Sequence, residues 1–223
     1  MPRTARAIVG GYCYHLINRG NNQATLFHEH SDYAAFLSLI TETQREFELP
    51  ILAACLMPNH VHLVVRPAGD ADLSIWTHRL FTTHVRRHHR KYQSTGRLWQ
   101  GRFKAFPIQQ DHHLITVIRY VERNALRAGL VARAEHWHWG SLRWRGMQGS
   151  WRIELAKSPV PLPENWVTYV NEPQTLSEVE SIRACISRHR PFGTENWVQR
   201  EARDLGLLQS IAPLGRPRRP ASK

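Results

Sequence analysis

The sequence predicts an α+β fold, in which helices cover one face of an antiparallel sheet and a small helical extension follows. Strand-like and helix-like segments succeed one another in the order βαββαβ, and a further helix comes next. A tight Pro-Asn turn between the second and third strand-like runs indicates an antiparallel hairpin. This order is typical of the split βαβ, or ferredoxin-like, arrangement.

Residue type and spacing predict the first strand and the first helix. Residues 8–18, "IVGGYCYHLIN", are rich in aromatic and β-branched types and end at the turn signal "NRGNN". Residues 31–47 place apolar side chains at helical spacing, with Ser31 as the cap, and Pro50 follows the helix.

The middle of the chain supplies the hairpin, a second helix and a fourth strand. The runs "ILAACLM" (51–57) and "HVHLVVRP" (60–67) form the hairpin, and residues 72–92 form an amphipathic helix. The run "RLWQGRFKAFPI" (97–108) is the fourth strand.

The C-terminal half begins with a third helix and then changes in composition. We expect this helix over residues 111–131, with Asp111 at its start and Gly129 as its C-terminal stop. Aromatic and proline-bearing segments follow Trp139. The sequence therefore predicts a main domain over residues 1–140 and a partly helical extension with a basic tail over residues 141–223.

Composition restricts the partners and the compartment. The 223 residues carry a formal charge of +12, which favours a polyanionic partner, most often nucleic acid, over a basic protein that is merely soluble. Cys13, Cys55 and Cys185 are odd in number and far apart, so they form neither a disulfide framework nor a CxxC zinc site. With no signal peptide and no membrane-spanning run, we expect a cytoplasmic protein that has no membrane partner.

Two histidines one residue apart, His60 and His62, interrupt an apolar strand. Side chains at i and i+2 of a strand project from the same face, so these two imidazoles converge. Neutral imidazole nitrogens bind divalent cations, and the pair can hold one metal ion. A His-apolar-His triplet also occurs as a structural feature, and the spacing alone leaves that alternative open.

The third helix carries a second pair, Tyr120 and Asn124, four residues apart on one face and about 6 Å apart along the axis. The Asn124 carboxamide oxygen can complete a third coordination position, and the Tyr120 phenol beside the metal can act as a nucleophile. The same spacing also fits a core aromatic residue on an amphipathic helix.

These segments carry a family resemblance. "MPNHVHLVV" (57–65), "LWQGRFKAF" (98–106) and "RYVERNALRAGLV" (119–131) resemble the HUH single-tyrosine transposases of the insertion-sequence-200 type. Within that group the chain most resembles the REP-associated tyrosine transposases. The segments "HLINRGN", "PFGTENWVQREARDLGL" and "GRPRR" extend the resemblance over almost the whole chain.

The resemblance implies a catalytic domain over residues 1–140, with His60, His62 and Asn124 as ligands of Mg²⁺ or Mn²⁺ and Tyr120 as the nucleophile. It implies metal-dependent nicking of single-stranded DNA and strand transfer through a 5′-phosphotyrosine, on REP-type palindromic hairpins. On ligand softness alone, two imidazoles fit zinc equally well.

The chain departs from this family at one position. Relatives commonly have proline after the asparagine, whereas this chain has Ala125. Alanine favours a continuous helix, which would keep Tyr120 and Asn124 aligned.

Basic residues predict where DNA is held. No Asp or Glu occurs from Leu73 to Gln110, and "RLWQGRFKAF" interleaves cations with aromatic side chains, as in surfaces that bind single-stranded DNA. The tail "GRPRR" resembles short arms that lie in an A·T-rich minor groove. A solvated basic face is the alternative. The residues expected to contact DNA are Arg19, Arg86, Arg87, Arg90, Arg97, Arg102, Lys104, Arg216 and Arg218.

Two other functions share this fold or this chemistry. A catalytically silent DNA-hairpin binder or repressor is one, although competent residue types fill all four chemical positions. A rolling-circle replication initiator or plasmid relaxase is the other, and it fits the small size and motif order less well. The protein is expected to be a monomer or a homodimer, with the long extension favouring the monomer.

Overall fold

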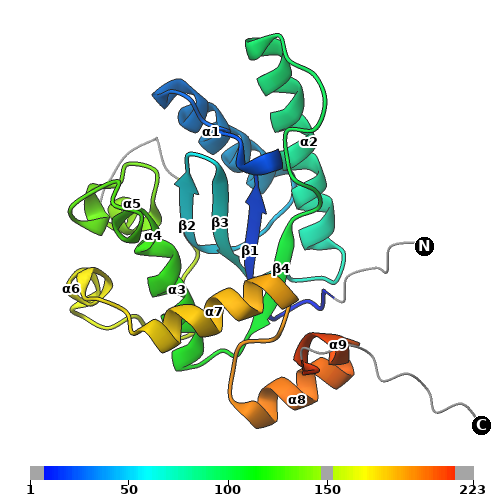
Figure 1. Ribbon diagram of the computed structural model, residues 1–223, viewed down its shortest axis with the longest axis vertical. Helices are drawn as coiled ribbons and strands as arrows, with labels where there is room; N and C mark the ends of the chain where they lie inside the picture. The colour runs from blue at the N-terminus through cyan, green and yellow to red at the C-terminus, as the bar shows by residue number, and fades with distance from the viewer. Residues whose placement is uncertain (1–7, 147–152, 214–223) are drawn as a thin grey trace, which may run out of the picture.

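A computed structural model describes residues 8–146 and 153–213 (Figure 1). Its centre is a four-stranded sheet in the order β2-β3-β1-β4, in which every pair of neighbours is antiparallel. The strands are β1 (Cys13–Arg19), β2 (Ile51–Met57), β3 (His60–Val65) and β4 (Lys104–Ile108). The predicted α+β, ferredoxin-like fold is therefore confirmed.

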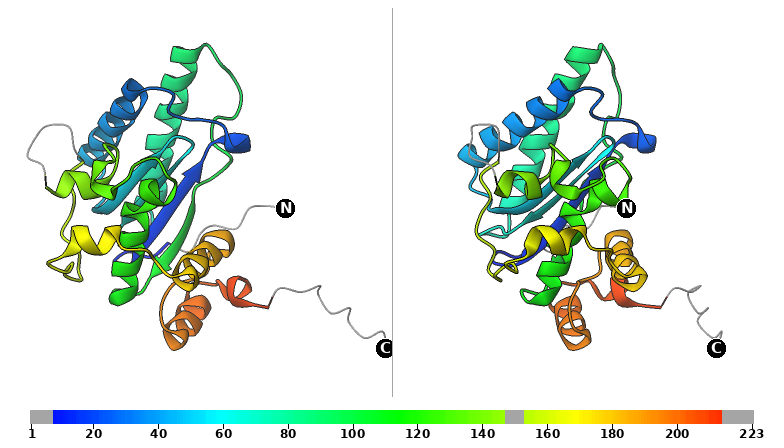
Figure 2. Two further views of the ribbon diagram at one scale, coloured as in Figure 1. Left: turned by 60° about the vertical axis from the view of Figure 1, so that its left-hand side comes forward. Right: turned by 90° about the vertical axis from the view of Figure 1, so that its left-hand side faces the viewer.

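Helices cover both faces of this sheet (Figure 2). Helices α1 (His30–Glu46) and α2 (Asp72–Tyr92) lie together on one face, as predicted. Helix α3 (His112–Glu122) packs on the opposite face, so the expectation of a single covered face holds only for the first two helices. Helix α3 buries Leu114, Val117 and Ile118 completely, against the face of the sheet opposite α1 and α2.

Strand alternation divides the buried residues between two cores. On β3, Val61, Leu63 and Val65 belong to the core beneath α1 and α2. Val64 belongs to the core beneath α3, and His60 and His62 share its face because side chains two residues apart point the same way. The histidines therefore face the third helix.

Three boundaries differ from the prediction. Strand β1 begins only at Cys13, because Gly11, with φ of +83°, turns the chain just before it. Strand β4 covers only residues 104–108, since β1 pairs with it only as far as Ile17. The cap of α1 is Glu29 rather than Ser31, and the Asp32 side chain accepts a hydrogen bond from the Glu29 amide at 3.2 Å.

The predicted continuous third helix is wrong at its centre. Helix α3 ends at Glu122, and a short helix α4 (Asn124–Arg127) follows Arg123, whose ψ of −5° departs from the helical value. Arg123 donates hydrogen bonds to the carbonyls of Val170 and Asn171. Such tertiary contacts outweigh the helix propensity of Ala125.

The predicted stop of this helical region is confirmed. Gly129 has φ of +70°, a conformation that favours glycine, and its amide donates to the Leu126 carbonyl at 3.0 Å. The Leu130 amide donates to the Ala125 carbonyl at 3.0 Å, which completes a Schellman motif.

The C-terminal residues pack against the sheet and α3. The elements not yet described are η1 (Asn21–Gln23), η2 (Ala134–His136), α5 (Ser141–Arg145), α6 (Trp166–Asn171), α7 (Leu176–Arg188), α8 (Glu195–Asp204) and α9 (Leu208–Ile211). Helix α7 lies beside α3 and β4 (Figure 1).

A buried carboxylate joins this extension to α3. Glu122, 2% exposed, accepts hydrogen bonds from Ser141 Oγ at 2.5 Å, Arg145 Nε at 2.8 Å and Trp166 Nε1 at 2.7 Å.

All three cysteines are buried and unbridged. In the part of the chain that the structure describes, no helix combines the length and the apolar character needed to cross a membrane.

Candidate active site

Three histidines and a tyrosine meet on the sheet face that α3 covers. The rings of His60 and His62 have centroids 4.9 Å apart, and His15 of β1 stacks on His62 at 5.0 Å. The Tyr120 ring lies edge-on to this group, 6.0 Å from His62 and 6.2 Å from His15. The structure therefore brings His60, His62 and Tyr120 together, as the sequence predicted from strand and helix spacing.

A hydrogen bond to Asn59 determines which ring nitrogen of His60 carries the proton. The Asn59 amide nitrogen donates to the Gln23 carbonyl at 3.2 Å, so its oxygen must be the atom 2.6 Å from Nδ1 of His60. Because that oxygen only accepts, Nδ1 carries the proton and donates it. Nε2 of a neutral His60 therefore keeps its lone pair for a metal.

His15 is the corresponding partner of His62, in a hydrogen bond that two tautomers allow. Its Nε2 lies 2.8 Å from Nδ1 of His62, and both rings are buried. If Nε2 of His62 is to bind a metal, its Nδ1 must carry the proton and donate it to His15. Nδ1 of His15 then carries its own proton, and this buried atom has no hydrogen-bond partner among the described residues.

Burial keeps the three imidazoles neutral. It lowers the pKa of His60 to about 4, with help from the positive charges of Arg19 and Arg127. It lowers the pKa of His15 to about 3 and holds the pKa of His62 well below its usual value. Neutral imidazole is the form that binds a metal, so the site is ready for one at pH 7.

Asn124 and Tyr120 share a neighbour, Arg127. Nη2 of Arg127 donates to Oδ1 of Asn124 at 2.8 Å, and its guanidinium carbon lies 4.0 Å from the centroid of the Tyr120 ring. Asn124 is buried, and its Nδ2 has no partner among the described residues. Among the described residues, no hydrogen bond joins Asn124 to His60 or His62. Asn124 is instead connected to Tyr120 through Arg127, which contacts both.

The donor set fits a divalent cation. Two neutral imidazoles keep Nε2 available, and Oδ1 of Asn124 has a second lone pair beside the one that Arg127 uses. His60, His62 and Asn124 are therefore the residues that could hold a metal here.

A second group of metal-type ligands lies elsewhere. Donor atoms of Asp111, His112 and His113 lie within 4.8 Å of one another at the start of α3. Helical rise separates this group from Tyr120 by about 12 Å. Asp111 is also the helix cap, since its side chain accepts from the His113 amide at 2.8 Å, as the sequence predicted for this position.

Two of the predicted DNA-contacting residues lie beside the histidines. Arg19 pairs directly with His60 across β1 and β3, and it forms no ion pair within the described residues. Lys104 pairs with Ile17, which in turn pairs with His62, so Lys104 lies about 10 Å from His62 on the same face.

The other basic residues predicted to contact DNA differ in whether they form an ion pair. Arg87 pairs with Glu42 at 3.2 Å, and Arg79 nearby pairs with Glu46 at 2.9 Å, because α1 lies against α2. Four exposed residues have no ion pair in the described part of the chain: Arg86, Arg90, Arg97 and Arg102. Arg216 and Arg218 lie outside the described residues.

Most aromatic residues of the basic segment belong to the core. Trp99 is 6% exposed, Phe103 7% and Phe106 1%. A pocket of about 440 Å³ remains beside Trp99 and Phe103, with Phe81 and Arg102 also in its wall.

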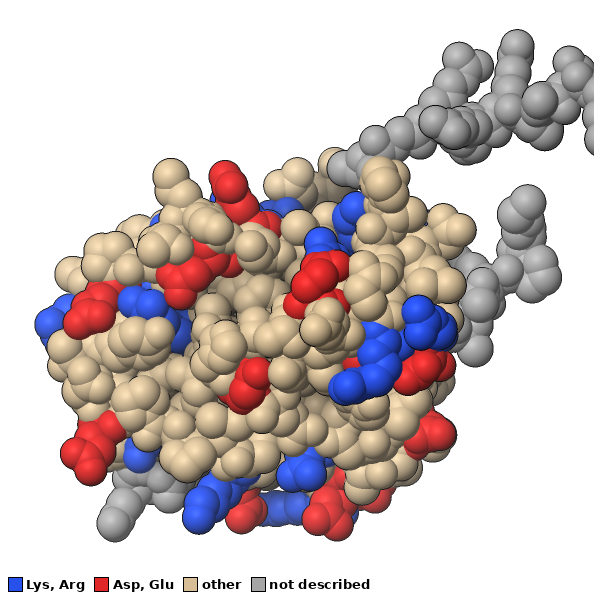
Figure 3. All heavy atoms as spheres, turned by 90° about the horizontal axis from the view of Figure 1, so that it is seen from below, with Lys and Arg blue, Asp and Glu red and all other residues tan. Residues whose placement is uncertain are grey.

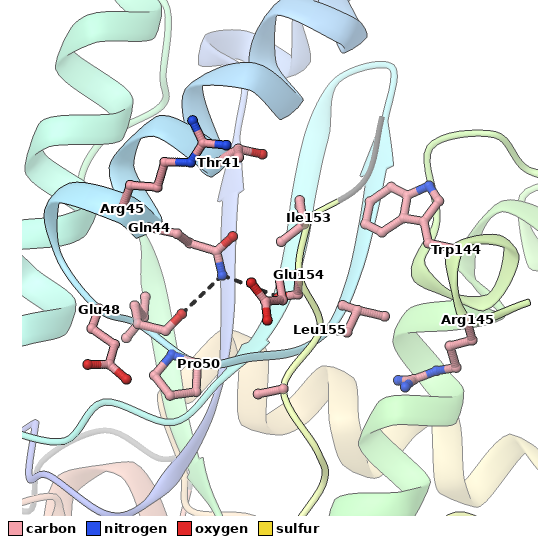
Figure 4. Close-up of a pocket in the computed structure, with 12 residues that line it drawn as sticks. Thr41, Gln44, Arg45, Glu48, Pro50, Trp144, Arg145, Ile153, Glu154 and Leu155 are labelled. Carbon is pink, nitrogen blue, oxygen red and sulfur yellow. Dashed lines mark hydrogen bonds between the residues drawn. The ribbon is translucent and has the colours of Figure 1, made fainter. Parts of the chain in front are cut away.

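Two other parts of the surface lie away from this site. At the lower end of the molecule, Lys and Arg are interspersed with Asp and Glu (Figure 3). A hollow of about 1010 Å³ lies between α1 and residues 153–156, where Gln44 donates to the Leu49 carbonyl at 3.3 Å (Figure 4). It shares no lining residue with the histidine group.

The sequence alone did not predict three residues of the candidate site. His15 and Asn59 act through the two predicted ligands, and Arg127 contacts Asn124 and Tyr120. A histidine within the apolar first strand is a signal for His15, and helical spacing is one for Arg127, three residues after Asn124. Asn59 occupies an ordinary turn position, and only the fold reveals its role.

Comparisons with known proteins bear on the family of this chain. The family model described as "Transposase IS200 like" matches residues 9–124. A Haemophilus influenzae protein described as a candidate REP-associated tyrosine transposase is 26% identical over 117 residues, which are 48% of this chain and 66% of that protein. The match thus spans just under two thirds of that relative.

A solved structure supports the fold. The structure of a REP-associated tyrosine transposase bound to a REP hairpin has a TM-score of 0.53 and 18% identity, and it covers 70% of this chain and 94% of that one. Because the family model spans more than half of the sequence, including β1, β3 and the Tyr120–Asn124 segment, the chain belongs to the IS200-like transposase family.

Proposed function

We propose that this protein nicks single-stranded DNA with Tyr120 and rejoins it, acting beside REP-type hairpins with Mg²⁺ or Mn²⁺ as its cofactor. The observation that carries the proposal is the hydrogen bond from Nδ1 of His60 to Oδ1 of Asn59, which leaves Nε2 of a neutral His60 with its lone pair. The His60 ring lies 4.9 Å from the His62 ring, which lies 6.0 Å from the Tyr120 ring. Membership of a transposase family and the hairpin in the similar structure support the reaction and the substrate class.

Tyr120 would act as the nucleophile. Its phenolic oxygen forms a bond to phosphorus, the bond from phosphorus to the 3′ oxygen breaks, and the 3′ oxygen takes up a proton. The 5′ phosphate is then an ester of Tyr120. A 3′-OH that attacks this ester reforms a phosphodiester and releases the tyrosine, so the number of phosphate esters is conserved and no nucleotide cofactor is consumed.

The other residues would position these partners. Nε2 of His60, Nε2 of His62 and Oδ1 of Asn124 would hold the cation, which polarises a phosphoryl oxygen when bound. Asn59 would keep His60 in the required tautomer, and His15 would do so for His62 by accepting a hydrogen bond from its Nδ1. Arg19 and Lys104 supply positive charge on the same sheet face for the flanking phosphates.

A covalent adduct tests the proposal. We would incubate the protein with Mn²⁺ and single-stranded oligonucleotides that carry hairpins from its own genome, and look for a protein–DNA band that resists denaturation. We expect the adduct with the wild type and none with Tyr120→Phe, which keeps the ring but lacks the attacking oxygen. Tyr169→Phe, which removes the hydroxyl of a half-buried tyrosine of α6, is the matched control and should form the adduct.

Two outcomes would contradict the proposal. A wild type that binds the hairpins and forms no adduct on any of them would indicate a silent DNA-binding protein on the same fold. An adduct that forms equally with Tyr120→Phe would show that another residue is the nucleophile.

A further inference from the structure

Arg127 is a cation in the candidate site that has no carboxylate partner. Its guanidinium donates to three neutral oxygens: Oδ1 of Asn124 at 2.8 Å, Oε1 of Gln174 at 3.3 Å and the Tyr120 carbonyl at 3.4 Å. Within the described residues it forms no ion pair, although the same helical region holds Arg119 near Glu178. Its charge is therefore not balanced by the protein around it.

This charge is partly withdrawn from water. The Arg127 side chain is half-buried between Asn124, Gln174 and the Tyr120 ring. Removing an ion from water is costly unless an opposite charge or a full set of hydrogen bonds compensates it. A site that retains such a cation is suited to an anionic ligand.

The position of Arg127 indicates which anion it would bind. Its guanidinium stacks on the Tyr120 ring and bonds to Asn124, two residues between which the scissile phosphate would lie.

We infer that Arg127 is a catalytic residue that binds a non-bridging oxygen of the scissile phosphate beside Tyr120. This inference rests on the proposed nicking activity and deepens it. The guanidinium keeps Asn124 oriented through Nη2 and offers its charge to the phosphate, whose equatorial oxygens gain charge as the phenolic oxygen of Tyr120 attacks. No proton is transferred by Arg127 in this step.

A structural role for Arg127 makes a different prediction. If the arginine only ties Asn124 and Gln174 together, its loss would destabilise the fold and weaken every DNA complex alike. If it contacts one phosphate, its loss would matter only while that phosphate is charged. Neutral methylphosphonate, which keeps the ester but lacks the negative oxygen, separates the two roles.

The test uses the full chain with Tyr120→Phe, so that no covalent bond forms. We would measure the affinity of a genomic hairpin oligonucleotide in which one phosphate beside the stem is replaced by methylphosphonate, moving the replacement one position at a time. At one position we expect about tenfold weaker binding than with the phosphate, as for a hydrogen bond to a charged group. Adding Arg127→Gln should abolish this preference at that position alone.

Control variants keep the test interpretable. Arg123→Gln removes an equal charge four residues away. The Arg123 side chain donates to the Val170 and Asn171 carbonyls and, among the described residues, forms no hydrogen bond to the side chain of Tyr120 or Asn124, so the positional preference should persist. Arg127→Lys keeps the charge without the planar fork and should restore only part of the preference. With Tyr120 present, Arg127→Gln should slow adduct formation about 100-fold on the phosphate and little on the methylphosphonate.

The outcomes separate this inference from the proposed function. If the wild type forms an adduct and Arg127→Gln leaves the positional preference intact, the role of Arg127 is wrong and the nicking activity stands. If no adduct forms but the preference exists and depends on Arg127, the phosphate contact stands and the nicking activity fails. Equal weakening at every position, together with a lower melting temperature, would show a structural role and overturn the inference.

Discussion

Nε2 of His15 lies 2.8 Å from Nδ1 of His62, and the two rings stack on adjacent strands at the centre of the sheet. This contact gives a fully buried imidazole a role that its place in an apolar strand does not specify. It couples β1 to the predicted metal ligand on β3, because the state of one ring nitrogen determines the tautomer of the other.

His15 should therefore affect metal affinity without touching the metal. We expect His15→Ala to weaken Mn²⁺ binding about 10- to 100-fold, the usual cost of losing such a partner. Mn²⁺ titrations followed by electron paramagnetic resonance would measure this. Thermal unfolding without metal would show whether the variant is folded, and unchanged affinity in a folded variant would contradict the role.

The two groups of metal-type ligands can be separated by substitution. We expect His60→Ala to abolish adduct formation and most Mn²⁺ binding, while leaving much of the salt-dependent DNA affinity, which basic residues supply. His113→Ala removes a residue of the second group and should leave Mn²⁺ affinity and adduct formation near the wild-type values. The reverse pattern would place the functional metal at the start of α3.

The cations of α2 and the following segment should differ in their contribution to DNA binding. Arg102 is exposed and has no ion pair in the described part of the chain, whereas Arg79 pairs with Glu46. We expect Arg102→Ala to weaken hairpin binding and to reduce the slope of log affinity against log salt by about 1. Arg79→Ala should change this slope much less. Fluorescence anisotropy at several salt concentrations would measure both.

His84 provides a test of stability against pH. It is packed against Phe36 and Trp99, and burial, reinforced by the charge of His88, lowers its pKa to about 3. The unfolded chain binds this proton near pH 6.5, so the wild type loses stability as the pH falls from 6.5 toward 3. Relative to the wild type, His84→Leu should gain about 1.4 kcal/mol for each pH unit in this range.

Urea denaturation at pH 7.5, 5.5 and 4.5 would check this. Any difference in packing between histidine and leucine is the same at each pH, so only the change with pH is diagnostic. A difference in unfolding free energy that stays constant from pH 7.5 to 4.5 would show that His84 titrates normally in the folded protein.

Periodicity explains which parts of the site could be predicted. His60 and His62 share a strand face and Tyr120 lies on a strongly amphipathic helix, so two local patterns made them candidates, and the family resemblance then selected them. The order of strands and the hairpin followed from turn residues and from short apolar runs in the same way.

What the sequence missed depends on contacts between distant segments. The break between Tyr120 and Asn124 accompanies hydrogen bonds from Arg123 to residues some 47 positions later. The carboxylates of α1 that pair with Arg79 and Arg87 lie outside the acid-free stretch in the sequence, yet beside it in space. Strand and helix spacing contain no information about either contact.

The buried carboxylate of Glu122 limits how this protein can be divided or recombined. It lies two residues after Tyr120, and its three hydrogen-bond donors all come from residues beyond 140. A tail exchanged with that of a relative would have to bring a hydroxyl, a guanidinium and an indole to the same carboxylate. The helix that bears Tyr120 and the C-terminal extension are thus constrained to change together.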